Sequence, residues 1–131
     1  MKKFAAIITL FLCGCATIQG PANFDNNEYA LINKIFTLSE VYKLDCGDSV
    51  QTKSNFNQLS ELSMELVNYS ADIPNNLDTV KLGIPLNKMI SDASLKFTPH
   101  GYSIMYCKLK LDDIETAAGI IKHAIAERRR P

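Results

Sequence analysis

Apolar residues recur at spacings of three and four along most of the chain beyond residue 24, which is the period of an amphipathic helix. The pattern predicts a first helix over residues 26–44. A second helix is predicted to start between Ser49 and Asn55 and to end before Pro74. The apolar positions that define these two helices are Leu31, Ile35, Leu38, Tyr42, Phe56, Leu59, Leu62, Leu66, Tyr69 and Ile73.

Local signals support the first helix. Asp25 is placed to cap the free amide of Glu28, and Glu28 to reach back to the amide of Asp25. Phe24 and Tyr29 occupy the two positions of a hydrophobic staple. Gly47 follows the helix and suits a left-handed C-terminal turn.

The third segment, residues 77–97, is less regular. Gly83 and Pro85 interrupt its apolar period and predict a break or kink. The next stretch, Tyr102 to Leu111, alternates in part and is rich in Tyr and Ile. We interpret it as an extended connection or an early helix; the alternative is a strand that pairs with residues 80–84.

A fourth helix is predicted to open at Asp112, where Glu115 completes a second capping pattern. Cations gather after it, at Arg128 to Arg130, where they suit the helix dipole. They are also placed to meet acidic lipid headgroups or an acidic partner. Together the segments predict an all-α protein, a small four-helix bundle stapled by one disulfide; the strand alternative gives an α+β fold with a small β-α-β unit.

The first 15 residues carry a different pattern. Lys2 and Lys3 precede an apolar run, Phe4 to Leu12, that is too short to span a bilayer, which takes about 20 residues. Leu12-Cys13-Gly14-Cys15 resembles the bacterial lipobox, in which the final cysteine becomes the acylated first residue of the mature protein. The resemblance implies a signal peptide over residues 1–14, a lipidated tether over 15–23 and a helical periplasmic domain over 24–131. Ala16 implies the periplasmic face of the outer membrane.

The resemblance assigns different roles to the four cysteines. If Cys13 is removed and Cys15 is acylated, Cys46 and Cys107 remain in an oxidising compartment, where they are expected to pair. In an up-down-up-down bundle, the ends of helices one and three lie at the same pole, which favours this pairing.

Composition excludes some classes of function. The 14 basic and 14 acidic side chains balance, so there is no basic excess of the kind that binds nucleic acid. His100 and His123 stand alone, and none of the spacings typical of a metal site or a catalytic nucleophile occurs. We therefore expect no enzyme activity, no catalytic residue, no metal and no cofactor.

Two short stretches, residues 41–46 (VYKLDC) and 106–109 (YCKL), resemble pilotins, small outer-membrane lipoproteins that bind the C-terminal segment of secretin subunits. The resemblance implies a protein-binding module in the cell envelope. Two alternatives stay open: a phage- or plasmid-encoded lipoprotein, such as an outer spanin subunit or an entry-exclusion factor, and a structural subunit of an envelope complex.

Five large apolar residues of the first two predicted helices lie beside the main helical stripes. Such residues either complete the core or line a groove for an apolar helix. The candidates are Ile32, Phe36, Val41, Met64 and Val67.

Overall fold

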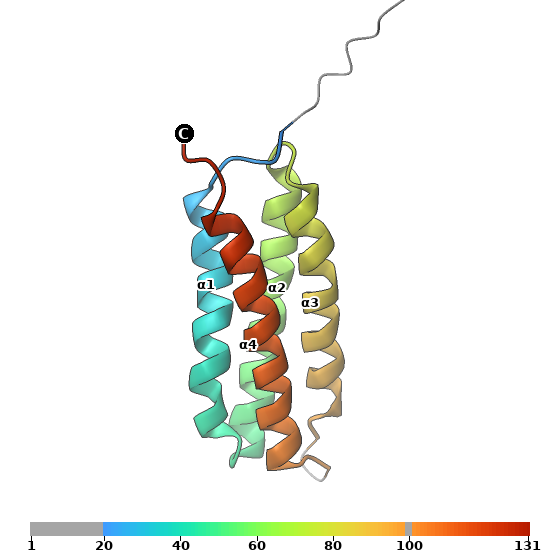
Figure 1. Cartoon of the computed structure of the whole chain (residues 1–131). Helices are drawn as coiled ribbons and strands as arrows, with labels where there is room; N and C mark the ends of the chain where they lie inside the picture. The colour runs from blue at the N-terminus through green and yellow to red at the C-terminus, as the bar shows by residue number, and fades with distance from the viewer. Residues whose placement is uncertain (1–19, 99–100) are drawn as a thin grey trace, which may run out of the picture.

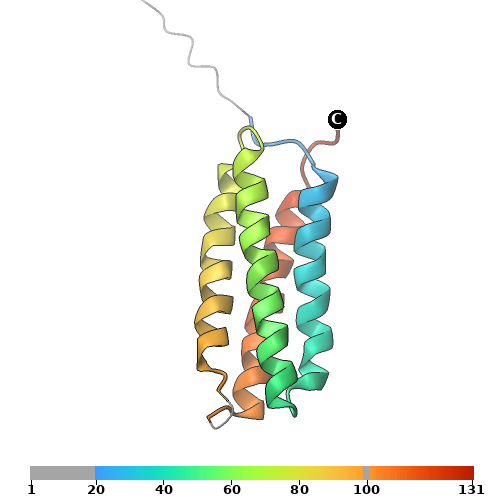
Figure 2. The ribbon, with the colours of Figure 1, turned by 180° about the vertical axis from the view of Figure 1, so that it is seen from behind.

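The computed structural model describes residues 20–98 and 101–131. In these residues, four helices run alternately up and down in one bundle (Figure 1, and from behind in Figure 2). The elements are α1 (Asn26–Val41), the short 3-10 helix η1 (Tyr42–Asp45), α2 (Ser49–Asp72), α3 (Leu77–Lys96) and α4 (Ile104–Ala126). The all-α prediction is confirmed, and the β-α-β alternative is wrong, because residues 80–84 and 104–111 are helical.

The bundle has two ends that we name by what they contain. The disulfide pole comprises η1, the start of α2, the end of α3 and the start of α4. The terminal pole comprises residues 20–25, the α2–α3 turn and residues 127–131 (Figure 1). The closest packing joins α2 to α3 and α1 to α4, which leaves α1–α2 and α3–α4 as the looser sides.

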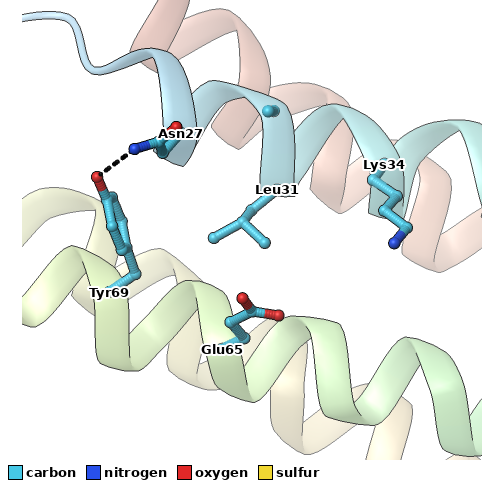
Figure 3. Close-up of a pocket in the computed structure, with 6 residues that line it drawn as sticks. Asn27, Leu31, Lys34, Glu65 and Tyr69 are labelled. Atoms are coloured by element: carbon cyan, nitrogen blue, oxygen red, sulfur yellow. Dashed lines mark hydrogen bonds between the residues drawn. The ribbon is translucent and has the colours of Figure 1, made fainter.

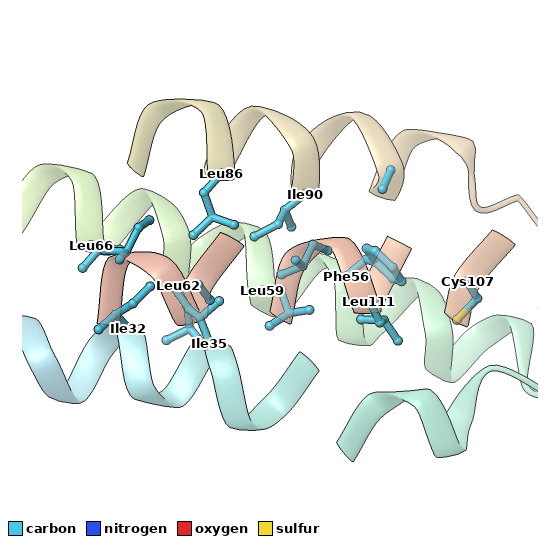
Figure 4. Packing of buried hydrophobic residues seen from close by; sticks show 14 of the residues in the cluster. Ile32, Ile35, Phe56, Leu59, Leu62, Leu66, Leu86, Ile90, Cys107 and Leu111 are labelled. Atoms are coloured by element: carbon cyan, nitrogen blue, oxygen red, sulfur yellow. The ribbon is translucent and has the colours of Figure 1, made fainter. Parts of the chain in front are cut away.

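The core is aliphatic with one aromatic cluster near the disulfide pole. Ring centroids of Phe56 and Phe97 lie 4.4 Å apart, and those of Tyr102 and Tyr106 lie 5.7 and 5.6 Å from that of Phe97. Ser39 and Ser63 are buried but bond to backbone carbonyls of their own helices. The larger aliphatic members, most of them shown in Figure 4, are Ile32, Ile35, Leu59, Leu62, Leu66, Leu86, Ile90, Leu111, Ile114, Ile121 and Ile125.

The start of α1 follows the prediction in part. Asp25 accepts hydrogen bonds from the amides of Asn27 and Glu28, both at 2.9 Å, and the rings of Phe24 and Tyr29 lie 5.5 Å apart. Glu28, however, is fully buried and bonds elsewhere, so the reciprocal half of the capping box is wrong. The helix also tightens into η1 at Tyr42, two residues before its predicted end.

The turns also differ from expectation. No glycine in the described chain has a positive φ, so the left-handed turn at Gly47 is wrong. Asn75 takes that conformation instead, with φ 61°, in the α2–α3 turn, where asparagine tolerates it. Asp48 caps α2 by accepting from the amide of Gln51.

The predicted interruption of α3 does not occur: residues 77–96 form one helix with Pro85 inside it. Pro85 lies on the exposed side, and burial of Leu86 and Ile90 on the opposite side favours the continuous helix despite its missing amide. Gly83 serves packing, because a Cβ added there would stand 2.9 Å from a methyl group of Val67. It thus marks close approach of α2 and α3.

The predicted start of α4 at Asp112 is also wrong. The helix begins at Ile104, and the Ser103 hydroxyl caps it by accepting from the amide of Tyr106. Cys107, Leu111, Ile114 and Ala118 form one buried stripe, as in Figure 4 for its first two members. This 4-3-4 spacing extends the helical period to five residues before Asp112 and outweighs the partial alternation.

Candidate binding surfaces

The Cys46–Cys107 disulfide is present, as predicted, with a Cα–Cα distance of 5.8 Å and a sequence separation of 61. It joins the residue after η1 to the first turn of α4. The hydroxyl of Tyr102 donates a hydrogen bond to the carbonyl of Cys46 beside it. The disulfide pole is therefore cross-linked both covalently and through a side chain.

An ion-pair cluster lies next to this bridge. Lys43 of η1 contacts the carboxylates of Asp112 and Glu115 on α4. Hydrogen bonds to Asp112 and then Glu115 raise the pKa of Lys43 above its ordinary value. The two acidic residues thus tie η1 to the middle of α4 rather than capping a helix start.

Exposed large apolar side chains gather at the disulfide pole. Of the twelve that the described part of the chain contains, seven lie in η1 or within the six helical residues nearest this pole, and they are 49–88% exposed. They are Val41, Leu44, Val50, Leu95, Ile104, Met105 and Leu109. A hollow of about 170 Å³ beside them is lined by Val50, Lys53 and Phe97 together with Ser49 and Thr98.

Of the five predicted partner-binding residues, one is buried and two are half-buried. Ile32 is 0% exposed, so the prediction that it lines a groove is wrong: its side chain belongs to the core. Phe36 is half-buried against α4, and the ammonium of Lys122 lies 4.5 Å from its ring centroid. Val67 is half-buried at its close approach to Gly83.

The other two are accessible but lie far apart along the bundle. Val41 is 49% exposed and belongs to the disulfide pole. Met64 is 54% exposed in the middle of α2. Sequence periodicity missed most of the exposed apolar residues at the disulfide pole, because their exposure depends on where the helices end.

A second accessible surface lies on the looser α1–α2 side, and we name it the α1–α2 hollow. Its first part, of about 360 Å³, lies between the helices, with the side chain of Leu31 directed toward α2 (Figure 3). Its second part, of about 460 Å³, continues over α2 and shares Glu65 and Tyr69 with the first. The remaining lining residues are Asn27, Ala30, Lys34, Glu61, Met64, Asn68 and Asp72.

The terminal pole holds a buried ion pair that sequence analysis did not foresee. Glu28, 0% exposed, accepts from Arg128 at 2.6 Å; the Arg128 side chain is 9% exposed. Asn76 and Ser70 donate to the second carboxylate oxygen at 2.6 and 2.9 Å, and Thr79 accepts from Arg128. Arg128 is therefore a buried partner of Glu28 rather than a solvated cation.

Residues just before α1 and just after α4 cover the terminal pole. The amide of Phe24 donates to the carbonyl of Arg129 at 2.9 Å, and the guanidinium of Arg130 lies 4.9 Å from the Phe24 ring centroid. Ala22, 6% exposed, is covered as the segment before α1 crosses the end of the bundle (Figure 1).

Residues 20–98 and 101–131 contain no group of three or more His, Cys, Asp or Glu placed to hold a metal ion. His123 is exposed and lies 3.2 Å from Glu127. In the same residues no helix is both long and apolar enough to cross a membrane. The predicted signal peptide, the lipidation site Cys15 and His100 lie outside the described residues.

Comparisons with protein-family models, with curated proteins and with solved structures found no match to this chain.

Proposed function

We propose that this protein is an outer-membrane-anchored lipoprotein, acylated at Cys15, whose periplasmic domain binds another envelope protein without catalysing a reaction. The observation that supports the proposal is the concentration of exposed large apolar side chains at the disulfide pole. Exposed apolar patches rimmed by polar residues mark interaction surfaces. Following the pilotin resemblance, the proposed partner is a secretin segment.

The position of the tether supports an orientation in which the disulfide pole faces away from the membrane. The segment of residues 20–25 lies at the terminal pole (Figure 1), and the five residues from Cys15 to Gly20 reach at most about 18 Å. The 24 residues of α2 extend about 36 Å along the bundle. A lipid on Cys15 would hold the terminal pole near the membrane, so the disulfide pole would face the periplasm.

The chemistry of the disulfide pole suits an apolar protein segment. The hollow beside Val50 has the buried ring of Phe97 in its wall and is large enough for a side chain of the partner. The aromatic cluster and the disulfide fix this wall before binding. A preformed pocket that receives a partner's apolar side chain is where binding energy concentrates.

The experiment that tests binding uses the full-length lipidated protein in native envelopes. In one variant, Leu44, Met105 and Leu109 are replaced by Ser. A matched control replaces Ile84, 55% exposed on the outer side of α3, by Ser. We expect the wild type and the control to be cross-linked to an outer-membrane secretin subunit, and the triple variant to lose the cross-link. Each exposed substitution should change unfolding free energy by no more than about 0.5 kcal/mol.

Two outcomes would contradict the proposal. If mass spectrometry finds an unmodified N-terminus at Cys15, the anchor is wrong. If the triple variant keeps every cross-link of the wild type while remaining folded, the disulfide pole is not the docking surface. Identification of a non-secretin partner whose cross-link the triple variant loses would retain the binding module and replace the pilotin role.

A further inference from the structure

We infer that the α1–α2 hollow is a second docking surface, which binds a cationic amphipathic helix of a partner protein. It lies on the side of the bundle, apart from the disulfide pole, and the inference does not depend on the function proposed for that pole. Three properties carry it: an apolar floor, a fixed end and uncompensated negative charge.

The floor is formed by apolar groups from both helices. Leu31, half-buried, extends from α1 toward α2, and the ring of Tyr69 closes one end of the part between the two helices (Figure 3). Met64, 54% exposed, continues the floor along α2. These side chains can cover the apolar stripe of a helix, and Met adapts readily to the shape of such a stripe.

One end of the hollow is held rigidly. The hydroxyl of Tyr69 donates to Asp25 at 3.1 Å and accepts from the side-chain amide of Asn27, also at 3.1 Å. Asp25 is itself the cap of α1. Because the Tyr69 ring is fixed by these bonds, a ligand that packs on it loses little free energy to ordering of the site.

The rim is negative and lacks paired cations. Glu61, Glu65 and Asp72 line it, and in residues 20–98 and 101–131 none of them has a Lys, Arg or His nitrogen within salt-bridge distance. Lys34 is the one cation among the lining residues of the hollow, and it stands across from Glu65 without pairing (Figure 3).

This charge pattern favours a cationic ligand. Glu61 and Glu65 stand four residues apart on α2, a spacing at which like charges destabilise a helix. Some exposed carboxylates elsewhere have a cation beside them, as Asp92 does with Lys88 at 2.7 Å, whereas three that are unpaired in the described residues lie together at this rim. A ligand with Lys or Arg beside its apolar stripe would pair with the rim and relieve this repulsion.

The length of the hollow sets the length of the ligand. Its lining runs along α2 from Glu61 to Asp72, a rise of about 16 Å. A helix of about 11 residues, or three turns, covers that distance. The expected ligand is therefore a short segment with Leu-like residues at spacings of three and four and basic residues on both flanks.

The probe is a labelled synthetic helix of about 14 residues built from Leu and Lys, and its counterpart in which Glu replaces every Lys. Fluorescence anisotropy with the full chain should show binding of the Lys peptide only, weakened at about 0.5 M salt. The triple variant Glu61→Gln, Glu65→Gln, Asp72→Asn should lose about tenfold in affinity. Met64→Ser should also weaken binding, because it removes an apolar side chain from the floor of the hollow.

A charge-matched control separates a defined site from general attraction. It carries Glu40→Gln, Asp92→Asn and Glu127→Gln, three exposed carboxylates on other faces. Its affinity should stay within about twofold of the wild type. NMR shifts should fall on Leu31 and Tyr69. Equal losses in both triple variants, shifts confined to the disulfide pole, or no binding of the Lys peptide would each overturn the inference, and none bears on the cross-linking test above.

Discussion

The two poles of the bundle are closed in opposite ways. At the disulfide pole a covalent bond joins Cys46 to Cys107, and large apolar side chains such as Leu44, 88% exposed, face solvent. At the terminal pole no covalent link is present in the described residues. There a buried pair of Glu28 and Arg128 joins α1 to the segment after α4 through charged hydrogen bonds.

The comparison shows how a covalent link changes what a surface can do. Charges buried at the terminal pole require complete pairing. The polar groups around Glu28 therefore bond to one another and are not free to bind a partner. The disulfide stabilises its pole independently of the side chains at the surface, since it acts largely on the unfolded chain. Apolar side chains there are thus available for another protein.

The largest expected effect comes from removal of the disulfide. The double variant Cys46→Ser, Cys107→Ser opens a loop with a sequence separation of 61, and chain entropy predicts a loss of about 4 kcal/mol in unfolding free energy. Urea denaturation measures it. Reduction of the wild type should give the same loss. A change below about 1 kcal/mol would show that the ion pairs around η1 hold this pole without the bridge.

The next effect tests the terminal pole. Arg128→Ala leaves the buried carboxylate of Glu28 without its cation, and we expect a loss of about 3 kcal/mol. Arg129→Ala is the matched control, because the side chain of Arg129 is exposed and its carbonyl keeps the bond to Phe24. A double-mutant cycle with Glu28→Gln should show strong coupling; additive losses would mean that the pair does not act as one unit.

The smallest effect is a pH dependence at the disulfide pole. Because the pKa of Lys43 is raised above its ordinary 10.5 by Asp112 and Glu115, folding favours its charged form. Its contribution is fully present below the unfolded pKa and is lost as pH rises through the folded pKa. Lys43→Met should remove the part of the decrease in unfolding free energy at alkaline pH that comes from deprotonation of Lys43.

The amount should stay below about 1 kcal/mol, since the side chains of Lys43 and Asp112 are 25% and 57% exposed. The measurement is unfolding free energy at neutral and alkaline pH in both proteins. The wild-type minus variant difference should shrink with rising pH. A difference that is constant across this range would show that Lys43 acts through packing alone.

The candidate surfaces were less predictable than the fold, for identifiable reasons. Met64 and Val41 were found because they lie beside the apolar stripes, but the same criterion selected Ile32, which is buried. Periodicity locates a residue on a helix face and does not say which neighbour covers it. The hollow at Leu31 depends on the wider α1–α2 packing, which no local pattern encodes.

Local sequence determined α1 and α2 to within a few residues, the cap at Asp25 and, by elimination, the Cys46–Cys107 pair, because these depend on spacing within one segment or on the number of available thiols. Tertiary structure decided the contacts between residues that are far apart in the sequence. Glu28 lies 100 residues from Arg128, and its short-range role as a capping partner was displaced by a buried ion pair. A buried charge must be paired wherever its partner stands in the sequence. Likewise, Pro85 stays within α3 because burial of one helix face outweighs one missing backbone hydrogen bond.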